Sequence, residues 1–252
     1  MEITKNNLSF NVKGAYSEKW FSCAQFQHWE KSTFHIMDHY FNMNGTYIDI
    51  GAWIGPTVMY AAQIFKNVVA IEADRLAFHR LTENLSVNNF NNITLVNKCL
   101  SDKNEVISFG GNGKWGNSES TMLVSNPEYS SWEGRWTKEE REQHIESVET
   151  ISIDTLFATN DINPEKVCFI KMDIEGGEMI VIPGISHILC KYKPVLYLSL
   201  HYCFLQGHHV HDILDTLFNI YDNCYTFDDE GFKSKINKDT IIDNLVTAIV
   251  FE

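Results

Sequence analysis

Carboxylates and one histidine stand where several apolar runs of the sequence end. Asp49 lies in the first run, just before a turn that contains Gly51 and Gly55, whereas Asp173 and His201 each follow a later run. In open α/β sheets, ligands bind outside the carboxyl ends of the strands. We therefore expect these side chains to meet at one edge of a sheet, where they could hold a ligand or move a proton.

The turn after the first run predicts a nucleoside-binding site. Gly51 lets the backbone bend and approach a ligand closely, and Gly55-Pro56 starts a helix. Glu72 ends the next predicted strand, where a carboxylate can accept hydrogen bonds from both hydroxyls of a ribose. The alternative interpretation is a tight strand-to-helix turn in which Asp49 only caps the helix.

The residues of this turn favour S-adenosylmethionine (SAM) over a dinucleotide. A dinucleotide site requires GxGxxG, whose second glycine admits the pyrophosphate, and Trp53 occupies that place. SAM has no phosphate but carries a sulfonium and an ammonium, which suit an acid better. We expect Asp49 near the ammonium and Glu72 on the ribose, with Ala52, Trp53 and Ala73 against the same ligand.

Strands and helices alternate along most of the chain. Strands are predicted at residues 46–50, 68–71, 93–98, 167–172, 195–200, 222–227 and 245–251. Helices are predicted at 57–65, 76–88, 176–191 and 210–219, after one or two amphipathic helices within 16–41. The alternation indicates an α/β fold, with a mostly parallel sheet and helices on both faces. We assign residues 1–45 to an N-terminal helical cap and 46–252 to a Rossmann-like domain.

Residues 103–147 interrupt this alternation and are far longer than a usual connection. We interpret them as an inserted lid or acceptor-binding loop. Trp115, Trp132 and Trp136 could pack against sugar rings or bases, and Arg135 could pair with the pyrophosphate of a nucleotide-linked sugar. Alternatively, the tryptophans hold the loop against the core, or they pack against a second subunit in a homodimer.

Composition limits the class of protein. The chain has 252 residues, is 44% hydrophobic and carries a net charge of −13, so it is a poor general binder of nucleic acid. It has neither a run long enough to span a membrane nor the apolar core of a signal peptide. The six cysteines form no CxxC pair, and we expect them to be reduced in a cytoplasmic protein.

Several segments, in this order, resemble the FkbM family of SAM-dependent methyltransferases. They read YIDIGAWIG, AIEADRLAFHRLTENLSVNN, CLSD, ISIDTLF and FIKMDIEGGE, and the resemblance covers roughly residues 46–201 except the insertion. It implies the class I methyltransferase fold with a seven-stranded sheet. It also implies methylation of a hydroxyl, in many members on sugars, polyketides or other secondary metabolites, here in surface-polysaccharide or natural-product synthesis.

The resemblance also implies a donor pocket. Asp49, Gly51 and Gly55 would line the methionine moiety, Glu72 would hold the ribose, and the adenine would be bordered by Ser101 or Asp102. One departure concerns the strand near residue 198, which in relatives often ends in Glu-x-His. Here Ser199 replaces the glutamate and His201 is kept.

Methyl transfer to a hydroxyl needs a group that removes one proton. One version makes His201 or Asp173 a direct general base. In the other, both residues hold a divalent ion, Mg²⁺ or Mn²⁺, that acidifies the hydroxyl. Glu175 is a further catalytic candidate, although an acid there also suits a helix N-terminus. Lys171 shares the face of Asp173 and either joins the catalytic group or only pairs with an acid.

Two other functions compete with this one, and one further motif invites a metal site. A dinucleotide-dependent oxidoreductase would use the same fold, and Trp53 argues against it. A non-catalytic homologue is favoured only by Ser199. The run Gly207-His208-His209-Val210-His211 could bind metal, but we interpret it as a solvated loop at a helix start.

Overall fold

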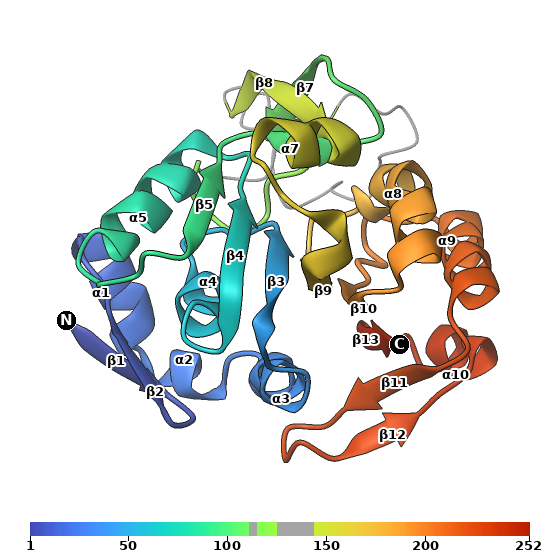
Figure 1. The fold of residues 1–252 in the computed structure, drawn as a ribbon, viewed down its shortest axis with the longest axis horizontal. Helices are drawn as coiled ribbons and strands as arrows, with labels where there is room; N and C mark the ends of the chain where they lie inside the picture. Colours follow the sequence, from blue (N-terminus) through green and yellow to red (C-terminus); the bar gives the residue numbers. More distant parts are fainter. Residues whose placement is uncertain (111–114, 125–143) are drawn as a thin grey trace.

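The computed structural model describes residues 1–110, 115–124 and 144–252. Its central feature is an eight-stranded sheet in the order β12-β11-β13-β10-β9-β3-β4-β5 (Figure 1). The strands are β3 (Asn42–Ile50), β4 (Phe65–Ile71), β5 (Ile93–Val96), β9 (Val167–Met172), β10 (Val195–Ser199), β11 (Cys224–Phe227), β12 (Lys233–Lys235) and β13 (Ala248–Phe251). All seven predicted strands are present, and the short edge strand β12 is an eighth.

Strand directions confirm the predicted class of fold. Strands β5, β4, β3, β9 and β10 are parallel, and β13 runs antiparallel between β10 and β11. Apolar side chains from both faces of these strands are buried, as the continuous apolar runs predict. This is the α/β architecture of class I methyltransferases.

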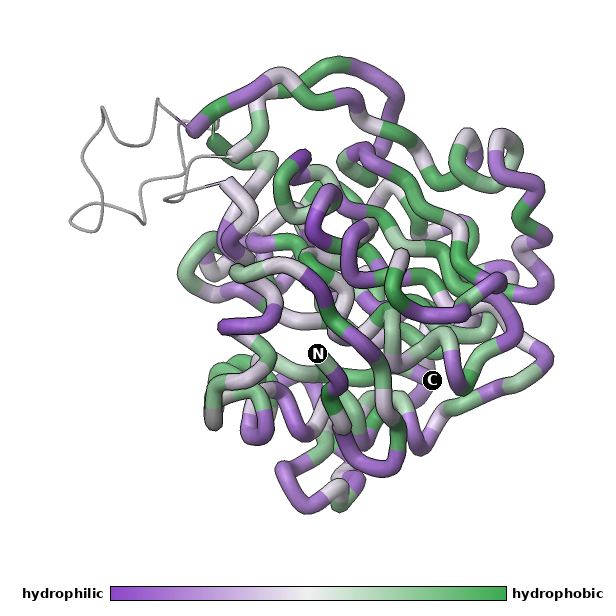
Figure 2. Tube along the Cα trace, turned by 90° about the vertical axis from the view of Figure 1, so that its left-hand side faces the viewer, coloured by the Kyte–Doolittle hydropathy of each residue, from purple (hydrophilic) through white to green (hydrophobic). Residues whose placement is uncertain are grey.

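Alternating strand residues face different helical layers. Ile48 and Ile50 pack with α8 (Glu178–Tyr192) and α9 (Gly207–Ile220), whereas Tyr47 packs with α3 (Lys31–His39) and α4 (Pro56–Ala61). Further elements are α5 (Arg75–Leu85), α7 (Ile153–Thr159), η1 (Pro164–Lys166) and α10 (Lys238–Asp243). Helix α4 ends before the predicted residue 65 because Phe65 already starts β4. Hydrophilic stretches lie mainly in outer turns (Figure 2).

The segment before β3 is more divided than predicted. A hairpin of β1 (Glu2–Lys5) and β2 (Leu8–Asn11) precedes α1 (Ala15–Ser22), α2 (Ala24–His28) and α3. The helices are separated by Cys23, which is extended, and by Glu30, which is left-handed with φ 43°. Lys5 is buried and its Nζ donates to the carbonyls of Phe26 and Trp29 at 3.0 and 2.9 Å, so the hairpin is tied to the helices.

The predicted insertion begins and ends in strands. Strands β6 (Cys99–Ser101), β7 (Val106–Gly110) and β8 (Ile145–Ser152) form a separate sheet in the order β6-β8-β7, at the top of Figure 1. The interpretation of 103–147 as one loop is therefore wrong at both ends. Within the described residues, no helix is both long and apolar enough to cross a membrane. All six cysteines are unpaired, as predicted.

Candidate active site

A crevice opens at the carboxyl ends of β3, β4, β9 and β10. Glu72, after β4, lines one side of it, Asp173 and His201, after β9 and β10, line the other, and Gly51, after β3, lies between them; Glu30 reaches it from the N-terminal segment. The parallel register brings these strand ends together, since Asp49 lies beside Lys171 on β9 and Lys171 lies beside Tyr197 on β10. The predicted convergence at one sheet edge is thus present.

The glycine turn is built to pass close to β9. Gly51 has φ 86°, and a Cβ at this position would lie 1.9 Å from the carbonyl oxygen of Asp173. The backbone N–H groups of Gly51 and Ala52 both donate to the carbonyl of Ile71 at 3.0 Å, which folds the turn over the end of β4. Trp53, also left-handed at φ 48°, continues the turn along the crevice wall.

Glu72 is held by backbone donors at the mouth of the crevice. Its Oε2 accepts from the N–H of Trp53 and its Oε1 from the N–H of Asp74, both at 2.7 Å. The side chain is almost buried, and burial raises the pKa of Glu72 to about 7. A carboxylate has about four acceptor sites, so each oxygen keeps capacity for a ligand hydroxyl.

Asp49, predicted to contact the cofactor, lies behind the crevice wall. Asp49 is fully buried, and its Oδ2 accepts from Tyr47 at 3.1 Å and Thr57 at 2.6 Å, while Oδ1 lies 3.4 Å from Lys171 Nζ. It does not line the crevice, because strand alternation turns it beneath the glycine turn. Burial raises the pKa of Asp49. Thr57 and Lys171, which it holds, do reach the wall.

Three other residues that were predicted to contact the cofactor do not line the crevice either. Ser101 donates to Asp102 at 3.1 Å on β6, and the residues that border the crevice there are Lys98, Cys99 and Leu100. Gly55, at φ 89°, packs against α5, where a Cβ would meet Leu81. The remaining predicted residues Gly51, Ala52, Trp53, Glu72 and Ala73 all line the crevice.

The N-terminal segment, predicted to be a helical cap, supplies wall residues that were not predicted individually. Trp20 and Trp29 line the crevice with Trp53, and the ring centroids of Trp20 and Trp53 are 4.7 Å apart. Glu30 lies next to them and accepts from Thr33 at 3.1 Å. Burial, together with Asp173, raises the pKa of Glu30 to about 7. The sequence marked these tryptophans only as an apolar helix face and gave no signal for Glu30.

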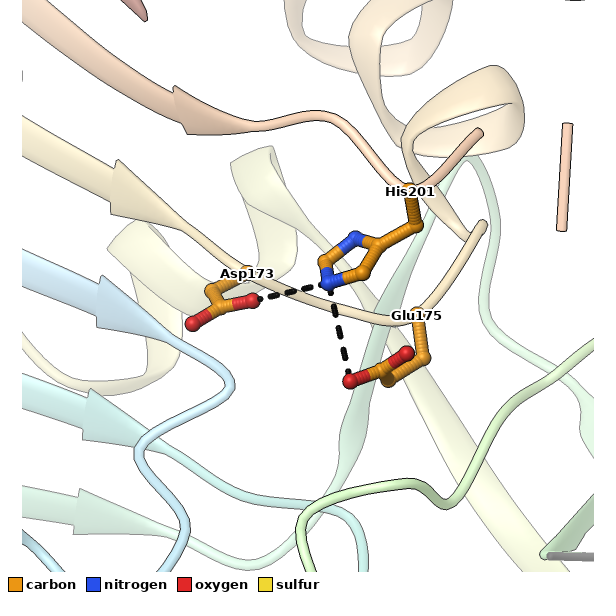
Figure 3. A group of neighbouring side chains, drawn as sticks. All are labelled: Asp173, Glu175 and His201. Carbon is orange, nitrogen blue, oxygen red and sulfur yellow. Dashed lines mark ion pairs between the residues drawn. The ribbon is translucent and has the colours of Figure 1, made fainter. Parts of the chain in front are cut away.

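At the other end, two carboxylates converge on one imidazole (Figure 3). Nε2 of His201 lies 3.2 Å from Oδ1 of Asp173 and 3.5 Å from Oε1 of Glu175. Its Nδ1 lies 2.8 Å from Oε1 of Glu178, the first residue of α8. Glu175 is left-handed at φ 52°, before the Gly176-Gly177 turn into α8. The structure therefore brings together the predicted residues Asp173, Glu175 and His201.

The electrostatics of this group weigh against His201 as a direct base. Burial opposes charge on His201, but Glu178 and Asp173 outweigh it and raise its pKa well above the ordinary value. Burial also opposes charge on Asp173, yet Lys171 and His201 hold its pKa well below the ordinary value. Burial raises the pKa of Glu175 to about 8. An imidazole that keeps its proton at neutral pH cannot take another one.

Lys171 pairs with acids, as one of its two interpretations predicts. Its Nζ lies 3.4 Å from Asp49 and 3.3 Å from Asp173, and the side chain is 3% exposed. Ser199, which replaces the acid of relatives, lies at the end of β10 and lines the crevice.

Most of the predicted acceptor contacts are not part of the described crevice. Trp115 lies beside α5 near Arg75 and His79, away from the crevice, so the predicted substrate contact is not seen. Trp132, Arg135 and Trp136 lie outside the described residues. The histidines at 208, 209 and 211 lie among the first five residues of α9 rather than in a loop. Among the described residues, the group whose side chains could hold a metal ion is Asp173–Glu175–His201.

The sheet has the fold of class I methyltransferases, and its crevice carries Glu72 after β4 and a polar cluster after β9 and β10. Residues 49–233 match the family model described as the methyltransferase FkbM domain, which is more than half of the chain. The chain therefore belongs to the FkbM family of SAM-dependent methyltransferases.

A solved structure of an FkbM methyltransferase shares the fold, and a second structure is more weakly similar. Methyltransferase FkbM from Methylobacillus flagellatus KT is similar with a TM-score of 0.53 at 17% identity, over 96% of this chain and 56% of that chain. This chain thus spans little more than half of that relative. A precorrin-6y C5,15-methyltransferase from Geobacter metallireducens GS-15 has a TM-score of 0.44 at 11% identity, over 88% of this chain and 86% of that chain. Comparison with curated proteins found no match.

Proposed function

We propose that this protein transfers the methyl group of SAM to a hydroxyl of a small polyhydroxylated compound, most simply a sugar. The observation that carries the proposal is the single crevice with Glu72 at one end and the Asp173–Glu175–His201 group at the other. A nucleoside held by the first places its sulfonium toward the second. The S–CH3 bond breaks, an O–CH3 bond forms, and the hydroxyl proton passes to a carboxylate at the polar end, Asp173 or Glu175, and from there to water.

The residues that line the crevice provide a contact for each part of the donor. Glu72 accepts from the ribose hydroxyls, and the glycine turn passes under the methionine moiety. Because Asp49 is buried away from the crevice, the ammonium is assigned to Glu30. The methionine carboxylate is assigned to Lys171, whose contacts to Asp49 and Asp173 are longer than 3.2 Å and leave it capacity for a further acceptor.

The acceptor contacts are those of a neutral polyol. Carboxylates accept from hydroxyls, and Asp173, Glu175 and Ser199 give the polar end several such groups. A pyrophosphate finds less support in the described wall, because Lys171 lies between two acids and Lys98 pairs with Glu149 at 2.6 Å. A nucleotide-linked sugar would depend on Arg135 and its neighbours, outside the described residues.

An acceptor panel with labelled donor tests this function. Purified protein is incubated with methyl-labelled SAM and free sugars, aminosugars, nucleotide-linked sugars and polysaccharide fragments. We expect label in a methyl ether of a neutral sugar, and no transfer by Asp173→Asn although it still binds SAM. Transfer to nitrogen or sulfur acceptors would contradict the hydroxyl assignment. Tight SAM binding without transfer to any acceptor would favour a non-catalytic homologue.

A further inference from the structure

The imidazole of His201 is surrounded by more carboxylates than it can neutralise. Asp173, Glu175 and Glu178 all lie within 3.5 Å of its ring nitrogens. Lys171 is the nearby described cation, and it also faces the buried Asp49. Four carboxyl groups therefore face two basic side chains in a largely buried site. Buried carboxylates are normally paired or coordinate a metal, so a bound cation would allow these groups to ionise together.

Glu178 adds an independent observation. It is fully buried, and its Oε2 has no hydrogen-bond partner among the described residues. Its Oε1 lies 2.8 Å from Nδ1 of His201 and also accepts from the N–H of Ile174 at 3.3 Å. A carboxylate on one ring nitrogen fixes the tautomer so that the other nitrogen is free as a ligand, which is the usual support of metal-bound histidines.

The three inward-facing groups have the geometry of ligands. One ligand atom each from Asp173, Glu175 and His201 lies within 4.8 Å of the others, and Figure 3 shows both carboxylates directed at Nε2. Glu175 holds its place through a left-handed backbone, which is strained for a glutamate. Such strain is typical of functional sites, and here it turns the side chain of Glu175 toward His201 rather than into solvent.

We propose that Asp173, Glu175 and Nε2 of His201 bind one divalent cation of the Mn²⁺ type, with Glu178 as the positioning residue behind His201. Carboxylates suit both Mg²⁺ and Mn²⁺, and between these two the imidazole, a softer ligand than oxygen, favours the transition metal Mn²⁺. The role of the ion rests on the proposed function. Asp173, Glu175 and His201 would hold the ion, which would supply Lewis-acid polarisation of the acceptor hydroxyl and lower its pKa, so that the proton could pass to water without a basic imidazole.

Manganese binding is measured first without acceptor. Metal-free protein is titrated with Mn²⁺, and free Mn²⁺ is followed by electron paramagnetic resonance, with SAM affinity measured in parallel by calorimetry. We expect one bound ion in the wild type. Glu175→Gln and His201→Gln should weaken Mn²⁺ binding by more than about 10-fold and keep SAM affinity, and Glu178→Gln should cost about 10-fold through orientation alone.

A matched control is the exposed pair His187–Asp154, in which Nε2 lies 3.1 Å from Oδ1 but no third ligand is described. His187→Gln should leave Mn²⁺ binding unchanged. Equal loss in His187→Gln, or no binding by the wild type at millimolar Mn²⁺, would overturn the site. If SAM binds and methyl transfer proceeds in EDTA, the ion is refuted and the proposed function stands. If Mn²⁺ binds but no hydroxyl is methylated, the site stands and the proposed function fails.

Discussion

Gly51 and Asp173 are in backbone contact: the position of a Cβ at residue 51 falls 1.9 Å from the carbonyl oxygen of Asp173. This contact joins the turn proposed to bind the donor to the strand that leads into the proposed catalytic group. The two halves of the proposed reaction site are therefore held at a fixed separation by the sheet itself.

Gly51→Ala should be strongly destabilising. The added methyl group meets a backbone atom that cannot move aside, and φ 86° is unfavourable for alanine, so we expect a loss of about 1–3 kcal/mol in the free energy of unfolding. SAM affinity should fall with it. Chemical denaturation and calorimetry measure both. Gly207→Ala is the control, because nothing lies near its Cβ position, and an equal loss there would refute the argument.

SAM affinity should fall as the pH is lowered from 8 to 6. Burial raises the pKa of Glu72 to about 7, so Glu72 is a carboxylate above that pH and a neutral acid below it. Only the carboxylate can accept from both ribose hydroxyls while it keeps its backbone donors. Calorimetry at each pH measures the affinity. Glu72→Gln should bind SAM weakly at every pH. If SAM binding by this variant still depends on pH, a group other than Glu72 titrates, and Glu30→Gln is the next variant to examine.

Glu30→Gln should weaken SAM binding by about 10-fold, the worth of one charge-assisted hydrogen bond. The loss of affinity should appear only with ligands that carry the ammonium group. 5′-Methylthioadenosine, which lacks the amino-acid part, should bind wild type and variant equally. Competition binding with both ligands separates the effects. Similar losses for the two ligands would mean that Glu30 only shapes the crevice.

Lys5→Met should destabilise the N-terminal segment by about 1–3 kcal/mol, because the carbonyls of Phe26 and Trp29 lose a buried donor. Since Trp29 lines the crevice, SAM affinity should also fall. Urea unfolding and calorimetry test the two effects. Lys13→Met, at an exposed position of the same segment, should change neither. A stable Lys5→Met protein would show that the hairpin is not needed to hold the helices.

The parallel strands could be predicted because burial on both faces leaves a continuous apolar run. Residues 167–172 were predicted and observed with the same bounds. The hairpin β1–β2 and strand β7 were missed because they are short and only partly buried. The predicted end of α4 at residue 65 was wrong because the apolar residues 61–65 resemble a continuing helix, although the chain already turns into β4 there.

The site was predictable where it depends on strand ends and not where it depends on distant segments. Asp173 and His201 end adjacent strands, so their meeting follows from topology. Asp49 was misplaced although strand alternation puts it on the face of Tyr47, and that signal was available. Glu30 approaches Lys171 only through tertiary packing, which no local pattern records.

The left-handed break at Glu30 has a consequence for how the chain can be divided. A protein that begins at residue 42 would retain every strand of the central sheet, yet the crevice would lose Trp20, Trp29 and Glu30 from its wall. Exchanging residues in this first segment therefore offers a way to alter the proposed donor contacts while the side chains at the ends of β9 and β10 are kept.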